Sequence, residues 1–136
     1  MDAKIGTRMI KRTKHSRDDG YLVELFSKKY DDFKAVHSYL VRVAPGKTRA
    51  GHFHKKKTEV IFPVGGEVTI ILKEMENAQN QNKSAKEIIL SSEKEEYSGL
   101  LVPPELWHLI ENRTDKDAKI VVFSDSFDLE DTYQLE

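Results

Sequence analysis

Two histidines one residue apart, His52 and His54, stand in the basic stretch "RAGHFHKKKTE", which ends at Glu59. In an extended strand, side chains at positions i and i+2 point to the same face, roughly 6.5 to 7 Å apart. His52 and His54 are therefore expected to point into one space, and an adjacent strand could bring the Glu59 carboxylate toward it. His108 in "VPPELWHLIEN" has apolar neighbours and is expected to face inward from another strand.

Three imidazoles and a carboxylate can bind a divalent transition metal. The chain has no cysteine, so a thiolate site and a disulfide framework are excluded, and nothing indicates an oxidising compartment. Nitrogen and oxygen donors suit zinc, iron, manganese, nickel or copper, and the residues alone do not choose among them. An H-x-H pair by itself is more typical of a surface or core position, so the spacing around it matters. No organic cofactor is expected.

Runs of alternating or β-branched residues predict strands along most of the chain. Turn signals such as "APGK" and "VGG" leave room for hairpins and are too closely spaced for crossover helices. The sequence therefore predicts an all-β, antiparallel sandwich or barrel, with one domain over residues 1–136. The expected strands lie at 21–26, 36–44, 59–64, 67–74, 87–91, 99–103, 107–112 and 118–125.

Two segments depart from this rhythm. Residues 1–19 are expected to form an N-terminal arm or edge strand, and residues 74–86, rich in Asn and Gln, a polar loop. Charge is also uneven, because the first 17 residues carry six bases and one acid, whereas "SDSFDLEDTYQLE" carries five acids and no base. We expect the two ends to lie near each other or simply to be solvated.

The overall charge balance argues against several classes of partner. Lysine and arginine number 22 against 23 acids, a net charge of −1, so the chain lacks the basic field that nucleic-acid or membrane-surface binding needs. No apolar run suits a secretory signal or approaches the roughly 20 residues that span a bilayer. A cytoplasmic protein without nucleic-acid or membrane partners is expected.

The spacing around the histidines resembles a known motif. From Gly46 to Gly66 it reads Gly, five residues, His52, one residue, His54, four residues, Glu59, six residues, Gly. This resembles the first signature motif of the cupin superfamily at every fixed position. The resemblance implies a small antiparallel cupin β-barrel, also described as a double-stranded β-helix or jelly roll.

The second cupin motif is matched less completely. Pro103, His108 and Asn112 stand where the motif has Pro, His and Asn, but Glu105 and Tyr97 occupy the positions of its two glycines. The missing glycine at position 105 concerns the geometry of the "PPE" turn more than the histidine that follows it.

A longer resemblance covers nearly the whole chain. The stretches "RDDGYLVELF", "TRAGHFHKKKTE", "VPPELWHLIEN" and "SDSFDLEDTYQLE" are similar to cupins that tailor nucleotide-linked deoxysugars for surface polysaccharides. Two branches compete, the C-terminal cupin domain of the capsular polysaccharide epimerase/reductase and the WxcM-like thymidine-diphosphate-sugar 3,4-ketoisomerases. The resemblance implies an isomerase, an epimerase or ketoisomerase acting on a nucleotide-linked 4-keto-6-deoxy sugar by proton transfer next to the ketone.

The resemblance also implies roles for individual residues. His52 would be the general base, because a neutral imidazole suits this task near pH 7, and His54 would orient or assist it. Tyr39 is a candidate acid, and a half-buried tyrosine that packs on the sheet is the alternative. Arg49 would hold a substrate diphosphate through a bidentate guanidinium, and a surface arginine in a turn is the alternative.

Two further residues are expected to contact the substrate. Lys56 lies in a lysine run expected at the rim of the barrel, where it would favour a phosphorylated substrate. Trp107 would stack on a nucleotide base or, alternatively, pack in the core. Small cupins often pair edge strands, so a homodimer is expected.

A histidine that binds a metal through its lone pair cannot also act as the base. The ketoisomerases resembled here are metal-independent, whereas the capsular cupin domain binds zinc. With Glu59 and His108 present, a metal held by His52, His54, Glu59 and His108 is favoured, with zinc first and iron, manganese or nickel not excluded. The alternative functions are a metal-dependent cupin of another type, such as an oxygenase or sugar-phosphate isomerase, and a non-catalytic sugar-binding cupin.

Overall fold

The computed structural model describes residues 6–29, 31–74 and 85–135. All regular structure in these ranges is β-structure, as the sequence predicts. The strands are β1 (Arg8–Arg12), β2 (His15–Arg17), β3 (Gly20–Leu22), β4 (His37–Val43), β5 (Thr48–His52), β6 (Glu59–Gly65), β7 (Glu67–Glu74), β8 (Lys86–Ser91), β9 (Tyr97–Val102), β10 (Leu106–Glu111) and β11 (Ala118–Ser124).

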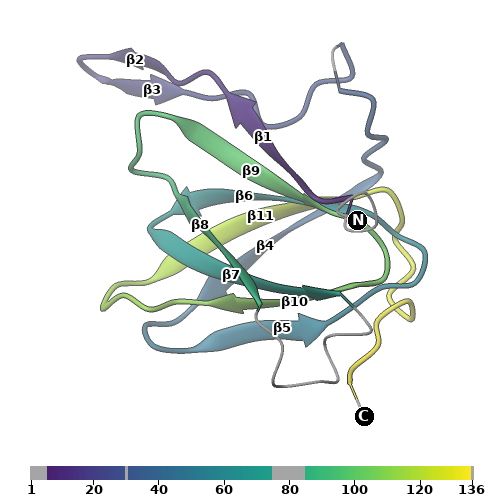
Figure 1. Ribbon diagram of the computed structural model, residues 1–136. Helices are drawn as coiled ribbons and strands as arrows, with labels where there is room; N and C mark the ends of the chain where they lie inside the picture. Colours follow the sequence, from purple (N-terminus) through teal and green to yellow (C-terminus); the bar gives the residue numbers. More distant parts are fainter. Residues whose placement is uncertain (1–5, 30, 75–84, 136) are drawn as a thin grey trace.

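Two antiparallel sheets face each other and form the barrel (Figure 1). One sheet has the strand order β1-β9-β6-β11-β4 and the other the order β5-β10-β7-β8. The predicted all-β, antiparallel architecture is therefore confirmed. The hairpin of β2 and β3 forms a small sheet of its own that projects beyond the two large sheets (Figure 1).

The apolar core lies between the two large sheets. Inward-facing positions alternate with outward-facing ones, most regularly in β10, where every second residue is buried. Removing each Val, Leu or Ile side chain of this core from water contributes roughly 1.5 to 3 kcal/mol before the entropy of folding is counted. The buried members of this core are Val43, Ile61, Val68, Ile70, Leu72, Leu90, Leu100, Val102, Leu106, Ile110, Ala118, Ile120 and Val122.

A second apolar cluster covers the outer face of the five-stranded sheet. The strand predicted at 21–26 is wrong beyond Leu22, where β3 ends, because the apolar residues that follow belong to this cluster and not to a strand. Val23 and Leu25 follow in irregular chain and pack, together with Phe33, on outward-facing residues of β6 and β9. Burial of alternate apolar residues thus satisfies the period-2 pattern without a strand.

The turn at Glu105 shows why the cupin motif has a glycine at this position. Glu105 adopts a positive φ of 67°. This backbone conformation is strained for any residue with a Cβ atom but not for glycine. The backbone N–H of Glu105 donates to the carbonyl of His54 at 2.7 Å. The turn therefore keeps the required geometry with glutamate in place and ties the start of β10 to the histidine region.

The structure describes only part of the predicted N-terminal arm (1–19) and of the predicted polar loop (74–86). Among the described strands, β1 pairs with β9 alone and forms an edge of the five-stranded sheet, and residues 1–5 lie outside the described ranges. Of the expected loop at 74–86, Glu74 ends β7, Lys86 starts β8, and residues 75–84 lie outside the described ranges. In the part of the chain that the structure describes, no helix has the length and apolarity needed to cross a membrane.

Candidate active site and metal-binding cluster

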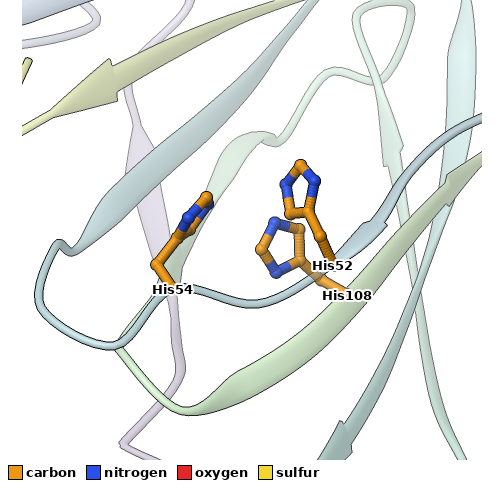
Figure 2. Close-up of side chains that lie close together, drawn as sticks. All are labelled: His52, His54 and His108. Atoms are coloured by element: carbon orange, nitrogen blue, oxygen red, sulfur yellow. The ribbon is translucent and has the colours of Figure 1, made fainter. Parts of the chain in front are cut away.

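The three histidines of the two motifs meet in the barrel interior (Figure 2). His52 at the end of β5 is the cross-strand partner of His108 in β10, and their ring centroids are 4.8 Å apart. His54 lies just beyond β5, yet its ring centroid is only 4.8 Å from that of His52. The ligand atoms that the three rings can offer all lie within 4.8 Å of one another.

Glu59 reaches the histidines from the facing sheet. It is the first residue of β6, and its side chain is almost completely buried. Glu59 Oε1 lies 3.3 Å from Nε2 of His54 and 3.7 Å from Nε2 of His108. Its other oxygen, Oε2, accepts a hydrogen bond of 2.7 Å from the Tyr39 hydroxyl. We call His52, His54, Glu59 and His108 the polar cluster.

The proton positions of two rings follow from their partners. Nδ1 of His54 lies 2.6 Å from the carbonyl oxygen of Asp131, and Nδ1 of His108 lies 3.1 Å from that of Leu106. A carbonyl oxygen can only accept, so both Nδ1 atoms carry a proton. In the neutral rings, both Nε2 lone pairs are therefore directed toward the Glu59 carboxylate. Nε2 of His54 is buried without a hydrogen-bond partner among the described residues.

This arrangement fits a cation. Two imidazole lone pairs and a carboxylate at 3.3 and 3.7 Å repel one another unless a positive charge lies between them. A backbone carbonyl on Nδ1 is the partner that metal-binding histidines commonly have. The buried cluster could therefore bind a divalent metal, and a proton shared with a ring nitrogen is the other species that would relieve the repulsion.

Burial sets the protonation of the cluster. The pKa of His52 is lowered to about 4, first by burial and then by the neighbouring His108 and His54, so this ring is neutral at pH 7. Burial also lowers the pKa of His108. Burial alone would raise the pKa of Glu59, but when Nε2 of His54 carries the shared proton, its hydrogen bond and charge lower that pKa to about 2, with smaller contributions from His108 and Tyr39. The pKa of Tyr39 is raised by burial and by Glu59, so the hydroxyl keeps its proton.

A small cavity of about 100 Å³ opens beside the cluster. His52, Glu59 and His108 line it together with two residues predicted for substrate contact or acid catalysis, Arg49 and Tyr39. The rest of its wall is apolar and consists of Val41, Ala50, Ile61, Ile110 and Val122. A neutral imidazole, a guanidinium and a phenol hydroxyl thus face one space.

The other two predicted substrate contacts do not line this cavity. Trp107 follows the alternation of β10 to the face opposite His108, where the Nζ atom of Lys73 lies 5.2 Å from the centroid of its ring. Lys56 has an exposed side chain, whereas the neighbouring Lys57 is buried. The alternation of β10 thus directs Trp107 away from the cavity, and the path of the loop after β5 directs Lys56 to solvent.

The C-terminal segment (residues 125–135) is the part of the site that sequence reasoning missed. Its acids meet the loop between His52 and Glu59, and Asp131 is 4% exposed. The basic N-terminal residues find other partners, as in the ion pair of Arg12 with Asp31. The sequence shows the run of acids without a base, but it does not show that the loop between His52 and Glu59 is their partner.

The chain matches the family described as "FdtA: WxcM-like, C-terminal" over residues 5–135. No curated protein matches the chain by sequence. Several solved structures share its fold. QdtA, a sugar 3,4-ketoisomerase from Thermoanaerobacterium thermosaccharolyticum solved with TDP, aligns with a TM-score of 0.77 at 24% identity over 95% of this chain and 88% of that chain.

Two further structures are similar. A 3,4-ketoisomerase from Helicobacter canadensis aligns with a TM-score of 0.78 at 20% identity over 96% of this chain and 92% of that chain. ChmJ, a 3'-monoepimerase from Streptomyces bikiniensis solved with dTDP-quinovose, aligns with a TM-score of 0.80 at 13% identity over 96% of this chain and 70% of that chain. At these identities the comparisons establish the cupin barrel fold.

Proposed function

The chain belongs to the WxcM-like, C-terminal (FdtA) family, and from this premise we propose that it is a sugar isomerase. The proposed substrate is a nucleotide-linked 4-keto-6-deoxy sugar, and the proposed reaction is proton transfer next to the ketone, as in a 3,4-ketoisomerase or an epimerase. Solved structures of QdtA, which shares the fold, contain TDP in one case and TDP-4-keto-6-deoxyglucose in another.

The observation that carries this proposal is the neutral imidazole at the cavity. His52 lines the cavity, and its pKa is lowered to about 4, so at pH 7 the ring can accept a proton. Arg49 lines the same space and is exposed enough to bind a diphosphate that enters from solvent. A base and an anion-binding group on one wall are what a nucleotide-sugar isomerase needs.

The proposed reaction balances within the sugar. His52 accepts the proton from the carbon next to the ketone, and the electron pair of that bond moves toward the keto oxygen to form an enolate. In ketoisomerisation a proton is then added to the former carbonyl carbon, the neighbouring hydroxyl gives up its proton and becomes the ketone, and the enolate oxygen takes up a proton and becomes the new hydroxyl. In epimerisation the proton returns to the opposite face of the first carbon. Neither outcome needs an external oxidant or reductant.

We propose that His54, Glu59 and His108 would hold a divalent cation, zinc first, with His52 as a fourth ligand when it does not act as the base. The convergence of both Nε2 atoms on Glu59 supports this proposal. A bound zinc would supply Lewis acidity for the keto oxygen or rigidity for the loop. Tyr39, hydrogen-bonded to Glu59, would keep the carboxylate oriented.

Incubation with a panel of nucleotide-linked 4-keto-6-deoxy sugars in heavy water tests the reaction. Mass spectrometry should find deuterium at a carbon next to the ketone. The absence of incorporation with every sugar, from folded protein, would overturn the proposal. Tight binding without turnover would then favour a sugar-binding cupin, and stoichiometric iron with oxygen uptake would favour a metal-dependent reaction of another type.

We also propose a homodimer. In the part of the chain that the structure describes, the edges of the two large sheets are formed by β1, β4, β5 and β8, and open edges tend to be paired or covered. β4 and the residue before it additionally expose Leu40 and Val36 to solvent. Light scattering of the purified chain tests the proposal, and a monomer mass at micromolar concentration would contradict it.

A further inference from the structure

The loop of residues 53–58 carries the chain from one sheet to the other, between His52 at the end of β5 and Glu59 at the start of β6. We call it the crossing loop. Its backbone N–H groups have no strand to pair with, so other acceptors are needed. The C-terminal segment supplies them for Phe53, Lys55, Lys56, Lys57 and Thr58.

Asp131 accepts three of these bonds with one carboxylate. Oδ1 takes the N–H of Lys55 at 2.9 Å, and Oδ2 takes those of Lys56 and Lys57 at 3.0 Å each. A buried carboxylate is strongly unfavourable without such donors, so Asp131 and the loop can hardly move apart. Tyr133 extends the attachment through two backbone bonds of 2.9 Å with Phe53.

The same residue reaches the polar cluster through its backbone. The carbonyl oxygen of Asp131 lies 2.6 Å from Nδ1 of His54 and so selects the ring form that carries its proton there. The Nε2 lone pair is then directed toward Glu59, 3.3 Å away, where it can serve as acceptor or ligand. The carboxylate thus holds in place the carbonyl that orients the ring.

We propose that Asp131 is a positioning residue of the site, which holds His54 with its Nε2 lone pair in the polar cluster. The consequence for catalysis rests on the proposed isomerase function, whereas the consequence for the ring does not. Without the carboxylate, the carbonyl is no longer held against Nδ1, and the His54 ring is expected to populate both neutral forms. Substitutions at such supporting positions typically lower activity or metal affinity about 10- to 100-fold.

The first experiment needs no variant. Long-range proton–nitrogen NMR correlation of the ¹⁵N-labelled full chain, treated with a chelator, reports which ring nitrogen of each histidine is protonated. Signals are assigned by replacing the other histidines singly with glutamine. We expect a proton on Nδ1 of His54, and a ring that lacks a proton on Nδ1 would overturn the proposal whether or not the protein turns over a sugar.

The variant D131N keeps the shape of the side chain but replaces one acceptor oxygen by a donor, which faces backbone N–H groups. The matched control is D128N in the same segment, since the Asp128 carboxylate accepts only from Glu130 among the described residues. Both variants remove one negative charge. We expect mixed ring forms of His54 in D131N and the wild-type spectrum in D128N, at a temperature where both are folded.

The kinetic readout is separate. In D131N we expect kcat for proton exchange to fall about 10- to 100-fold with an unchanged KM, because ring orientation and not substrate binding is altered. D128N should retain both constants. A folded D131N with a single, Nδ1-protonated His54 and full kcat would overturn the proposal. If neither the wild type nor a variant exchanges protons but the ring forms differ as expected, the positioning role stands and the isomerase function fails.

Discussion

The apolar core and the polar cluster occupy the same barrel interior but are held together by different means. β10 contributes to both, because buried Leu106 and Ile110 flank His108 on the inward face. The apolar side chains need only contact and exclusion of water, which are not directional. Each member of the polar cluster instead loses hydration and needs a partner at a defined place.

Those partners come from distant parts of the chain. His54 depends on the carbonyl of Asp131 in the C-terminal segment, and Glu59 on the hydroxyl of Tyr39 in β4. The core should therefore control stability, and the polar cluster should control chemistry at little or negative net stability. Substitutions in the core and in the polar cluster can test this division between stability and chemistry.

The largest effect is expected for His52→Ala. Removing the proposed base should lower deuterium exchange by about 10²- to 10⁴-fold, the range typical of general base catalysis. The unfolding temperature should change little, since a desolvated imidazole contributes little net stability. His15→Ala, in exposed β2, is the control and should retain exchange. Equal exchange rates in the two variants would remove His52 from the mechanism.

Ile120→Ala should show the opposite behaviour. Ile120 is fully buried in β11, and truncating such a side chain costs about 2 to 5 kcal/mol of unfolding free energy through lost burial and the cavity left behind. Denaturant unfolding measures the loss, and exchange per folded molecule should persist. The neighbouring Val121→Ala, on the outward face, should cost less. Loss of exchange in folded Ile120→Ala would contradict the view that the core controls stability and the polar cluster controls chemistry.

Glu105→Gly should stabilise the protein by about 1 kcal/mol, because glycine removes the strain of the positive φ. The greater entropy that glycine gives the unfolded chain offsets part of this gain. The bond from the N–H of residue 105 to the His54 carbonyl is retained. Glu105→Ala keeps the strain and is the control. Unfolding free energies for the three proteins decide the matter, and equal values for Gly and Ala would refute the strain.

The smallest effect concerns pH. His52 has its pKa lowered to about 4 from the usual 6.5, so the ring accepts protons from solvent only in more acidic solution. The exchange rate should therefore remain high at pH 5 and fall by about half near pH 4. Circular dichroism must show folded protein at each pH. A midpoint near 6.5 would mean that the base is a solvated imidazole.

The same pKa shift has a consequence for stability. Between pH 6.5 and about 4 the unfolded chain binds a proton at His52 that the folded chain does not. The free energy of unfolding should thus decrease as the pH falls through this range, and His52 should contribute no further change below it. In His52→Ala this part of the pH dependence should disappear.

Local patterns account for much of what was predicted from sequence. Alternation predicted most strands, because a half-buried strand needs apolar residues at every second position. The strand expected at 21–26 shows the limit, since Val23 and Leu25 satisfy the same pattern as irregular chain on an outer face. The spacing from His52 to Glu59 likewise identified residues that the structure brings together, and their metal-binding and catalytic roles remain predictions.

The sequence by itself determined the all-β architecture and which residue types could do chemistry, because periodicity and motif spacing are properties of neighbouring residues. Only the tertiary structure decided that Trp107 faces away from the cavity and that Asp131 meets the crossing loop. The bond between Asp131 and Lys55 joins residues 76 positions apart. A contact of this kind depends on the path of the whole chain, and no local pattern encodes it.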